Sequence, residues 1–299
     1  MTNPPAATPL APGTRQRIAA DALDAATAAA RAAGCHVRPI SALPDLEATC
    51  RLFEGIWKPA GENGLATTEL LRAMDKAGSY VAAAFDAADG GDLVGACIGF
   101  FGPPPDGSLH SHIAGVSARM RGRSVGFALK AHQRAWALER RTGHVSWTFD
   151  PLVRRNAYFN LGKLAGRAVQ YLPNFYGPMN DGINGADDTD RLLVEWHLAA
   201  PEVAAACHGH PPRARRLPDA AVALGATSDG RPHARAATGP MALVAVPADI
   251  ERLRHSDPRS AAAWRSAVRD VLGGLLADGW QVTGFDRAGW YLLVRKDTP

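Results

Sequence analysis

Three short apolar segments separated only by tight turns constrain this fold more than any other feature of the sequence. Residues 80–85, 93–101 and 109–116 carry the apolar runs, and the turns between them, DAADGGD and GPPPDGS, are rich in Gly, Pro and Asp. Such runs and turns are typical of strands and of the hairpin connections between them. Because a short turn joins antiparallel neighbours, the sequence predicts an antiparallel meander of three strands.

Helices and further strands surround the meander in a regular order. Apolar residues three and four positions apart predict helices, and short alternating or apolar runs predict strands. The fold class is therefore α/β, or α+β, with a mixed and mostly antiparallel sheet flanked by helices. The helices are expected at 14–34, 43–57, 68–76, 124–141 and 156–164, and the strands outside the meander at 36–40, 144–149 and 192–198.

The chain of 299 residues exceeds the length that one core comfortably serves, and its composition changes along the way. Residues 1–34 are expected to form a flexible tail and an Ala-rich helix, and residues 35–200 the main domain. Residues 201–240 are rich in Ala, Pro, Gly, Arg and His without a sustained period, so we expect a linker or an irregular loop there. Residues 241–299 are expected to form a β-α-β-β unit, with strands at 241–246, 281–285 and 290–295 and a helix at 258–277.

Composition and cysteine usage place the chain among ordinary folded proteins. Its residues are 46% hydrophobic and 21% charged, which excludes a wholly disordered chain and a collagen-like repeat. The cysteines have neither CxxC nor metal-type spacing, which suits a reducing cytoplasm. No apolar run is long enough to cross a bilayer. We therefore expect a cytoplasmic protein without a membrane partner.

Positive charge is concentrated in one part of the chain. The net charge is only +4, yet residues 110–170 hold eleven Lys and Arg against two acidic residues, Glu139 and Asp150. Within that block, the turn VSARMRGRSVG joins a strand to the start of a helix. A Gly/Arg-rich turn of this kind points main-chain N–H groups in one direction at the positive end of the helix dipole. The turn predicts a phosphate-binding site, and a solvated Arg-rich helix face is the plainer alternative.

Several ligand classes are excluded on motif grounds. The turn has neither the GxxxxGK[ST] of a nucleoside-triphosphate loop nor the GxGxxG of a dinucleotide fold. Nucleic acid is not expected as a partner, because no DNA- or RNA-binding motif occurs and aromatic residues are not interleaved with the basic ones. The pair His110 and His112 lacks a third ligand, so no metal site is predicted.

The basic turn resembles a known family motif. Arg121-Gly-Arg-Ser-Val-Gly126, followed by Ala-Leu, is similar to the acyl-CoA pyrophosphate loop of the GNAT superfamily of N-acyltransferases, Arg/Gln-x-x-Gly-x-Gly/Ala, with Ser124 in place of the usual middle Gly. The predicted order of elements over residues 35–200 also resembles the GNAT fold. More narrowly, segments at 147–152, 155–157, 163–164, 176–177, 190–191 and 195–196 resemble a bacterial subgroup often encoded beside N-acylamino-acid racemase or o-succinylbenzoate synthase relatives.

The resemblance implies an acyl-CoA cofactor, acetyl-CoA or succinyl-CoA, between the fourth and fifth strands. Its pyrophosphate is expected on the backbone of the turn, and its pantetheine along the strand that ends at Val116. A strand N–H near Gly115 or Val116 is expected to polarise the thioester carbonyl. The cofactor-binding residues that follow are Val116, Arg121, Gly122, Arg123, Ser124, Val125 and Gly126.

Three residues are candidates for proton transfer. Asp150, at the end of the strand 144–149, is the first candidate for the base or for holding the acceptor ammonium. His112 is the second candidate base, since the ordinary pKa of His near 6.5 suits proton transfer. Tyr176 is a candidate acid, because Leu161 occupies the position where many GNAT enzymes place a Tyr. The structural alternatives are a turn cap for Asp150, a polar residue on a half-buried strand for His112, and a loop anchor for Tyr176.

The acceptor and the acyl group are expected to meet His110, Arg155, Asn156 and Arg191. If the acyl group is succinyl, Arg155 or Arg191 is expected to bind its distal carboxylate, because guanidinium and carboxylate form paired hydrogen bonds. The structural alternatives are helix and loop stabilisation for Arg155 and Asn156, and an ion pair with Asp190 for Arg191.

These features predict an acyl-CoA-dependent N-acyltransferase. It would move an acetyl or succinyl group to the amine of a small molecule, one option being an amino acid, by direct attack in a ternary complex. Two alternatives stay open: a catalytically altered CoA-binding regulatory or scaffold protein, and a GNAT-fold enzyme of non-acylating chemistry. The oligomeric state also stays open, with a homodimer as one option.

Overall fold

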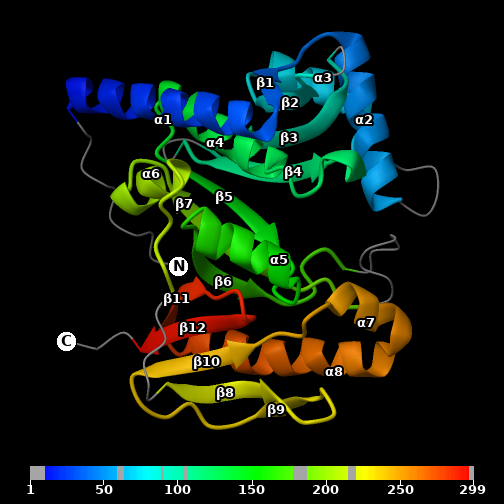
Figure 1. Ribbon diagram of the computed structural model, residues 1–299, viewed down its shortest axis with the longest axis vertical. Helices are drawn as coiled ribbons and strands as arrows, with labels where there is room; N and C mark the ends of the chain where they lie inside the picture. Colours follow the sequence, from blue (N-terminus) through cyan, green and yellow to red (C-terminus); the bar gives the residue numbers. More distant parts are fainter. Residues whose placement is uncertain are drawn as a thin grey trace.

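The structure is a computed structural model that describes residues 11–58, 64–88, 91–103, 107–177, 187–214 and 220–295. Within these ranges the chain forms two β-sheets with helices packed on them (Figure 1). The first sheet has seven strands in the order β1-β2-β3-β4-β5-β7-β6, and the second has five in the order β11-β12-β10-β8-β9. The first occupies the upper part of Figure 1 and the second the lower part.

The first sheet is antiparallel except between β4 and β5, which run parallel. The predicted meander is confirmed, since β2 pairs with β3 and β3 with β4, both antiparallel. This mixed, mostly antiparallel sheet flanked by helices is the expected fold class. Its strands are β1 (Cys35–Pro39), β2 (Tyr80–Asp86), β3 (Leu93–Phe101), β4 (Leu109–Val116), β5 (His144–Phe149), β6 (Arg167–Leu172) and β7 (Arg191–His197).

Helices cover both faces of the first sheet because its strands bury residues on both sides. Val81 and Ala83 of β2 pack in the cluster under α2 and α3. The intervening Tyr80 and Ala82 pack in the cluster under α4, as the two-residue period of a strand requires. The helices of this unit are α1 (Pro12–Ala33), α2 (Leu43–Trp57), α3 (Thr68–Lys76), α4 (Val125–Glu139) and α5 (Arg154–Ala157).

The Ala-rich helix α1 packs on α4. Ala22 and Ala26 of α1 form a small buried cluster with Ala131 and Ala135 of α4. Side chains this small let the two helix backbones approach closely, which explains how a helix with a weak apolar face finds a partner. The helix begins at Pro12, two residues before the expected start, because Pro suits the first helical position. Residues 1–10 of the expected tail lie outside the described residues.

The C-terminal unit contains the expected strands and helix, together with elements that the sequence analysis missed. The expected helix is capped at its start by Asp257, whose side chain accepts a hydrogen bond from the Ser260 amide. The helix runs through a π-helical turn rather than as one regular helix. The elements are β10 (Met241–Ala245), α7 (Ile250–Ser256), α8 (Pro258–Val268), η3 (Arg269–Gly273, π-helical), α9 (Gly274–Ala277), β11 (Trp280–Phe285) and β12 (Trp290–Arg295).

The expectation of a linker or irregular loop over 201–240 does not hold. Its described part contains α6 (Pro201–Cys207), β8 (Ala221–Ala226) and β9 (Pro232–Ala234). β8 pairs parallel with β10 inside the second sheet, and Leu224 is fully buried there. Ala and Gly have low strand propensity, so the pattern AVALGA does not stand out as a strand. The edge offered by β10 and the burial of Leu224 stabilise it.

Two further elements differ from the expectation. The helix expected at 156–164 starts as α5 at Arg154 and continues as η2, a π-helical turn at Tyr158–Lys163. β6 was not expected, because as an edge strand with four of its six residues not buried it shows little apolar pattern.

In the described ranges, no helix combines the length and apolar character needed to cross a membrane.

Candidate active site

The first sheet opens between its two parallel strands. β4 and β5 pair only at Leu109 with Val145 and at His110 with Ser146, and then they separate (Figure 1). From there to Val116, the edge of β4 that faces β5 has no described strand paired to it. Backbone N–H and C=O groups along such an edge need partners. An extended, amide-containing ligand could supply them.

A β-bulge interrupts β4 at the mouth of this opening. Consecutive residues Ile98 and Gly99 of β3 face Ile113 and Ser111 of β4, so His112 is the extra residue. A bulge leaves one residue out of the ladder and re-aims its side chain and backbone. His112 is accordingly exposed, whereas its neighbour Ser111 is buried.

The predicted phosphate turn lies at the far end of β4 and is open. The amides of Phe127 and Ala128 donate to the Ser124 carbonyl. The amides of Ser124, Val125 and Gly126 have no backbone acceptor among the described residues, as expected for the first turn of a helix. These N–H groups lie at the positive end of the α4 dipole. The turn can therefore hold a phosphate or diphosphate.

Two glycines keep this turn accessible. Gly122 has φ +81°, a left-handed conformation that Gly adopts without strain, and a Cβ there would meet nothing within 4 Å. A Cβ on Gly126 would meet only Val116 Cγ2, at 3.8 Å. Arg121 and Arg123 on either side are exposed, and neither forms an ion pair with a described residue. The seven residues expected to bind the cofactor are thus brought together, from Val116 to Gly126.

Lys163 also reaches the turn, which the sequence analysis did not assign to the site. Its Nζ donates to Ser124 Oγ at 3.2 Å and lies 4.8 Å from the centre of the Phe127 ring. Lys163 belongs to η2, which follows β5 in the chain. Its ammonium group lies against the turn that follows β4. The signal available in the sequence was its membership of the basic block at 110–170.

Two histidines and a phenylalanine gather on β3 and β4 at the opening. The Phe100 ring lies 5.2 Å from that of His110 and 5.8 Å from that of His112. His110 Nδ1 of β4 is hydrogen-bonded to Ser146 Oγ of β5, at 3.3 Å. Burial, with smaller effects of His112 and Lys130, lowers the pKa of His110 to about 4. Partial desolvation of its ring also lowers the pKa of His112, so both imidazoles are neutral at pH 7, and His110, with a pKa of about 4, is a weak proton acceptor there.

Tyr176 lies on the same side of β5 as Ser146. Its hydroxyl is 3.2 Å from Thr148 Oγ1, two residues after Ser146 on β5. Residues two apart on a strand share one face, so His110 and Tyr176 contact neighbouring positions of that face. The Arg191 guanidinium lies 5.2 Å from the centre of the Tyr176 ring, and burial lowers the pKa of Arg191. The structure thus brings His110, Tyr176 and Arg191 to the β5 side of the opening.

A buried lysine lies behind the bulge. Lys130 Nζ donates to Ser111 Oγ at 3.0 Å and to Gln133 Oε1 at 2.9 Å, and it lies 3.7 Å from the Trp147 ring centre. Burial lowers its pKa to about 8. Among the described residues no carboxylate pairs with it. The back of β4 therefore carries a positive charge in a medium of low polarity, which favours negative charge developing nearby.

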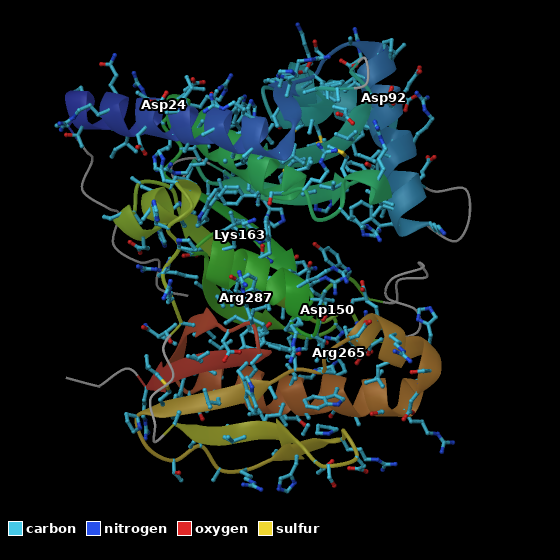
Figure 2. All side chains as sticks on the ribbon, viewed as in Figure 1. Asp24, Asp92, Asp150, Lys163, Arg265 and Arg287 are labelled. Carbon is cyan, nitrogen blue, oxygen red and sulfur yellow. The ribbon has the colours of Figure 1, made fainter. Side chains whose placement is uncertain are left out.

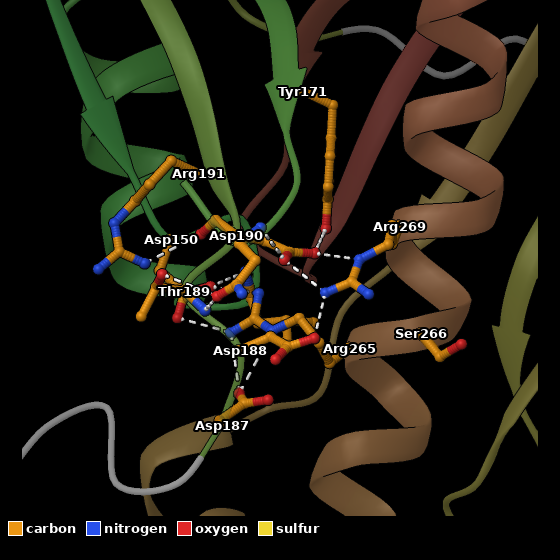
Figure 3. Close-up of polar contacts among 12 residues, drawn as sticks. Asp150, Tyr171, Asp187, Asp188, Thr189, Asp190, Arg191, Arg265, Ser266 and Arg269 are labelled. Carbon is orange, nitrogen blue, oxygen red and sulfur yellow. Dashed lines mark hydrogen bonds and ion pairs between the residues drawn. The ribbon is translucent and has the colours of Figure 1, made fainter. Parts of the chain in front are cut away.

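Asp150, the first candidate base, directly follows β5 and is held by the C-terminal unit. It is buried and bound by two guanidinium groups, of which the first is Arg254 at 2.6 Å. The second is Arg265 at 2.9 Å, which Figure 3 shows beside it. Burial alone would raise the pKa of Asp150, but Arg265 and Arg254 outweigh it and hold the pKa well below the usual range. A carboxylate held in this way is a poor proton acceptor. These contacts give Asp150 a structural role. Its side chain also accepts a hydrogen bond from the Leu152 amide, as expected for a turn cap.

The other expected acceptor residues lie on α5. Arg155 forms a two-pronged ion pair with Glu251 of α7, including a 2.6 Å contact, so its guanidinium is engaged by the C-terminal unit. Asn156 is half-buried and its side chain hydrogen-bonds to no described residue. Leu161 is buried in η2, so no hydroxyl occupies that position.

No family model matches the chain, and no curated protein matches it. Solved structures similar to it include the ribosomal-protein-S5-alanine acetyltransferase from Vibrio fischeri, at 14% identity and a TM-score of 0.45 over 55% of this chain and 93% of that one. The ribosomal-protein-alanine N-acetyltransferase from Brucella melitensis is 18% identical with a TM-score of 0.43, over 54% of this chain and 99% of that one. Ard1 from Thermoplasma volcanium is 18% identical with a TM-score of 0.41, over 55% and 97%.

Proposed function

We propose that this protein is an acyl-CoA-dependent N-acyltransferase of the GNAT type that acts on the amine of a small molecule. One observation carries the proposal: β4 leaves β5 after two residue pairs, and its unpaired edge leads to an open turn lined with N–H groups. An edge suited to amides, followed by a site suited to a diphosphate, matches the order of chemical groups in coenzyme A.

The residues present fit such a ligand. Ser124, Val125 and Gly126 offer main-chain donors, and Arg121, Arg123 and Lys163 add positive charge around them. Acyl-CoA would supply an activated thioester. In this proposal a β4 N–H beside the bulge polarises the thioester carbonyl, because Val116 lies next to the diphosphate turn and the pantetheine separates the two groups. The Lys130 charge behind the bulge assists it. Fixing both reactants at the opening supplies a further part of the rate.

His112 takes the role of base in this proposal, in place of Asp150. It is exposed at the bulge, and its lowered pKa keeps it neutral at pH 7, so it can remove a proton from the acceptor ammonium directly or through water. Tyr176 is the proposed acid for the leaving thiolate, with its hydroxyl held by Thr148. His110 orients Ser146 and completes the wall of the acceptor site.

Arg191 is the proposed partner of a carboxylate. Of the two cations expected to meet a succinyl group, Arg155 is exposed and paired with Glu251, whereas Arg191 is buried, donates to the Asp190 carbonyl and lies beside the Tyr176 ring. A buried guanidinium recognises a carboxylate by paired hydrogen bonds. The proposal therefore includes succinyl-CoA as a donor and an amino acid as an acceptor, and Arg191→Gln should change the ratio of succinyl to acetyl turnover.

A CoA-binding protein without catalysis is the second candidate, and the buried Leu161 favours it because no acid stands there. Two measurements decide between the two. Calorimetry with coenzyme A, acetyl-CoA and succinyl-CoA tests binding, and thiol release with a panel of amines tests turnover. We expect binding of all three and amine-dependent thiol release that falls at least tenfold in His112→Ala and Tyr176→Phe. Binding without thiol release supports the second candidate, and no binding contradicts both.

A further inference from the structure

The positively charged surface beside the phosphate turn continues onto the C-terminal unit. Lys163 lies against Ser124 at the turn, and Tyr158, at the other end of η2, accepts a hydrogen bond from Arg287 Nε at 2.9 Å. The guanidinium carbon of Arg287 is 5.0 Å from the centre of the Tyr158 ring. Arg287 belongs to the turn between β11 and β12. Figure 2 shows Lys163 and Arg287 one beneath the other where the two units meet.

The π-helical turn η2 fixes this arrangement. In a π-helix residues five apart are joined by a backbone hydrogen bond, so Tyr158 and Lys163 lie on adjacent turns. Gly162 allows η2 to lie directly on the C-terminal unit, since a Cβ there would come within 3.2 Å of the Phe285 carbonyl oxygen and closer still to the Tyr158 ring. The distance between the two cations is therefore set by packing between the units.

Neither cation has an acidic partner in the part of the chain that the structure describes. Among the described residues, no carboxylate forms an ion pair with Lys163 or with Arg287. Burial lowers the pKa of Lys163, Tyr158 partly opposes this, and the nearby Arg287 adds a smaller lowering effect. Two like charges held close together without a counter-ion repel each other, and an anion bound between them removes that repulsion.

A cavity of about 390 Å³ opens beside Arg287, lined also by Arg154 and Tyr158. Its acidic residues are already engaged: Glu251 pairs with Arg155, and Asp249 caps α7 by accepting the Arg252 amide. The cavity therefore offers room and positive charge beside Arg287.

We propose that Lys163 and Arg287 form a second anion subsite, which binds the 3′-phosphate of coenzyme A. This inference rests on the proposed function. Coenzyme A carries a diphosphate and, on the ribose beyond it, a phosphate monoester with up to two negative charges. With the diphosphate on the amides of residues 124–126, Lys163 stands at the border of the two phosphate sites and Arg287 beyond it. Arg binds phosphate through two parallel hydrogen bonds. The C-terminal unit thus completes the cofactor site.

The test compares coenzyme A with 3′-dephospho-coenzyme A by calorimetry on the full-length protein. We expect the unmodified protein to bind coenzyme A about tenfold more tightly than the dephospho compound. Arg287→Gln should remove most of that difference by weakening coenzyme A alone. Arg287→Lys, which keeps the charge but not the two-pronged geometry, should keep part of it. Arg259→Gln, an exposed change of equal charge on α8, is the matched control and should leave both affinities unchanged.

Three results would overturn the inference. They are equal affinities of the unmodified protein for the two compounds, equal weakening of both compounds in Arg287→Gln, and no weakening of either. Thermal melting of each variant shows whether it is folded, and Lys163→Met gives an independent variant that should weaken coenzyme A more than the dephospho compound. Failure of the proposed function looks different, because the unmodified protein would then bind neither compound.

Discussion

At the scale of single residues, Ser124 has an unusual backbone conformation for its type. Its φ of +63° and ψ of +19° lie in the left-handed region, where a residue with a Cβ is strained by about 1 kcal/mol. The loop motif that this turn resembles has Gly at this place. Ser124 lacks the conformational freedom of Gly, but its hydroxyl accepts a hydrogen bond from Lys163. The strain therefore accompanies a contact at the candidate cofactor site.

Ser124→Gly separates the strain from the contact. We expect this variant to be more stable by about 1 kcal/mol in denaturant unfolding, because Gly adopts the left-handed conformation freely. Loss of the hydroxyl should at the same time weaken coenzyme A binding, since Lys163 is no longer held at the turn. Ser124→Ala is the control: it keeps the Cβ and should gain no stability. Equal stability of the Gly and Ala variants would contradict the assignment of strain.

The partners of the Asp150 carboxylate could not be predicted from the sequence. Its position at the end of a predicted strand is correct, and so is the turn cap weighed as an alternative. Its two Arg partners lie 104 and 115 residues further along the chain, on α7 and α8. No local pattern links residues so far apart, so the sequence could not show that its charge is neutralised. The Gly/Arg-rich turn at 121–126, by contrast, is a local pattern and could be recognised in the sequence.

At the scale of elements, the first turn of α4 combines two properties that a substitution can separate. Gly126 is the second residue of the helix, where an acidic side chain stabilises the helix dipole. The space around a Cβ at this position is open. The same position faces the proposed diphosphate.

Gly126→Glu should therefore fold normally and fail to bind. We expect unchanged or slightly increased thermal stability, because the carboxylate lies at the positive end of the helix dipole. Coenzyme A affinity should fall at least tenfold through repulsion of the diphosphate. Gly126→Ala, whose Cβ makes only an ordinary contact with Val116, should keep both stability and affinity. Tight binding by the Glu variant, measured by calorimetry, would place the diphosphate elsewhere.

Elements with a strong apolar pattern were predictable from sequence, and elements stabilised by distant partners were not. The bounds of α2, α3, β3, β4, β5 and β12 agree with the prediction residue for residue. β8 is Ala-rich and becomes a strand beside β10, which lies 20 residues further along the chain. The bulge at His112 also depends on pairing with β3 and leaves no trace in the alternation of β4.

At the scale of the whole molecule, buried ion pairs join the C-terminal unit to the first sheet. Asp150 and Asp187 bind Arg254 and Arg265, and Asp190 binds Arg269 at 2.6 Å (Figure 3). Asp187 and Asp190 lie just before β7, and the three Arg lie on α7, α8 and η3. The Tyr291 hydroxyl adds a hydrogen bond to the Pro151 carbonyl at 2.7 Å. These contacts make the two units one structure rather than two independent domains.

Removing one member of this network should destabilise the entire protein. Arg265→Met leaves Asp150 and Asp187 to share Arg254, and an uncompensated buried charge costs about 3–5 kcal/mol. We expect the free energy of unfolding, measured with denaturant, to fall by that amount. Arg265→Lys should lower it less, because Lys keeps the charge but lacks the paired N–H donors of a guanidinium. Arg259→Met, exposed on the same helix, should change stability little. A loss in Arg265→Met no larger than in this control would show that the network contributes nothing.

The same long-range pairing has a consequence for the order in which the protein is made. β5 leaves the ribosome with Asp150 at its end, and Arg265 is synthesised 115 residues later. At usual rates of translation that delay is roughly ten seconds. For most of this interval neither Arg254 nor Arg265 has been made, so the carboxylate lacks both guanidinium partners and must stay in water. The first sheet of the nascent chain therefore stays partly open until residues of the last third of the chain have been synthesised.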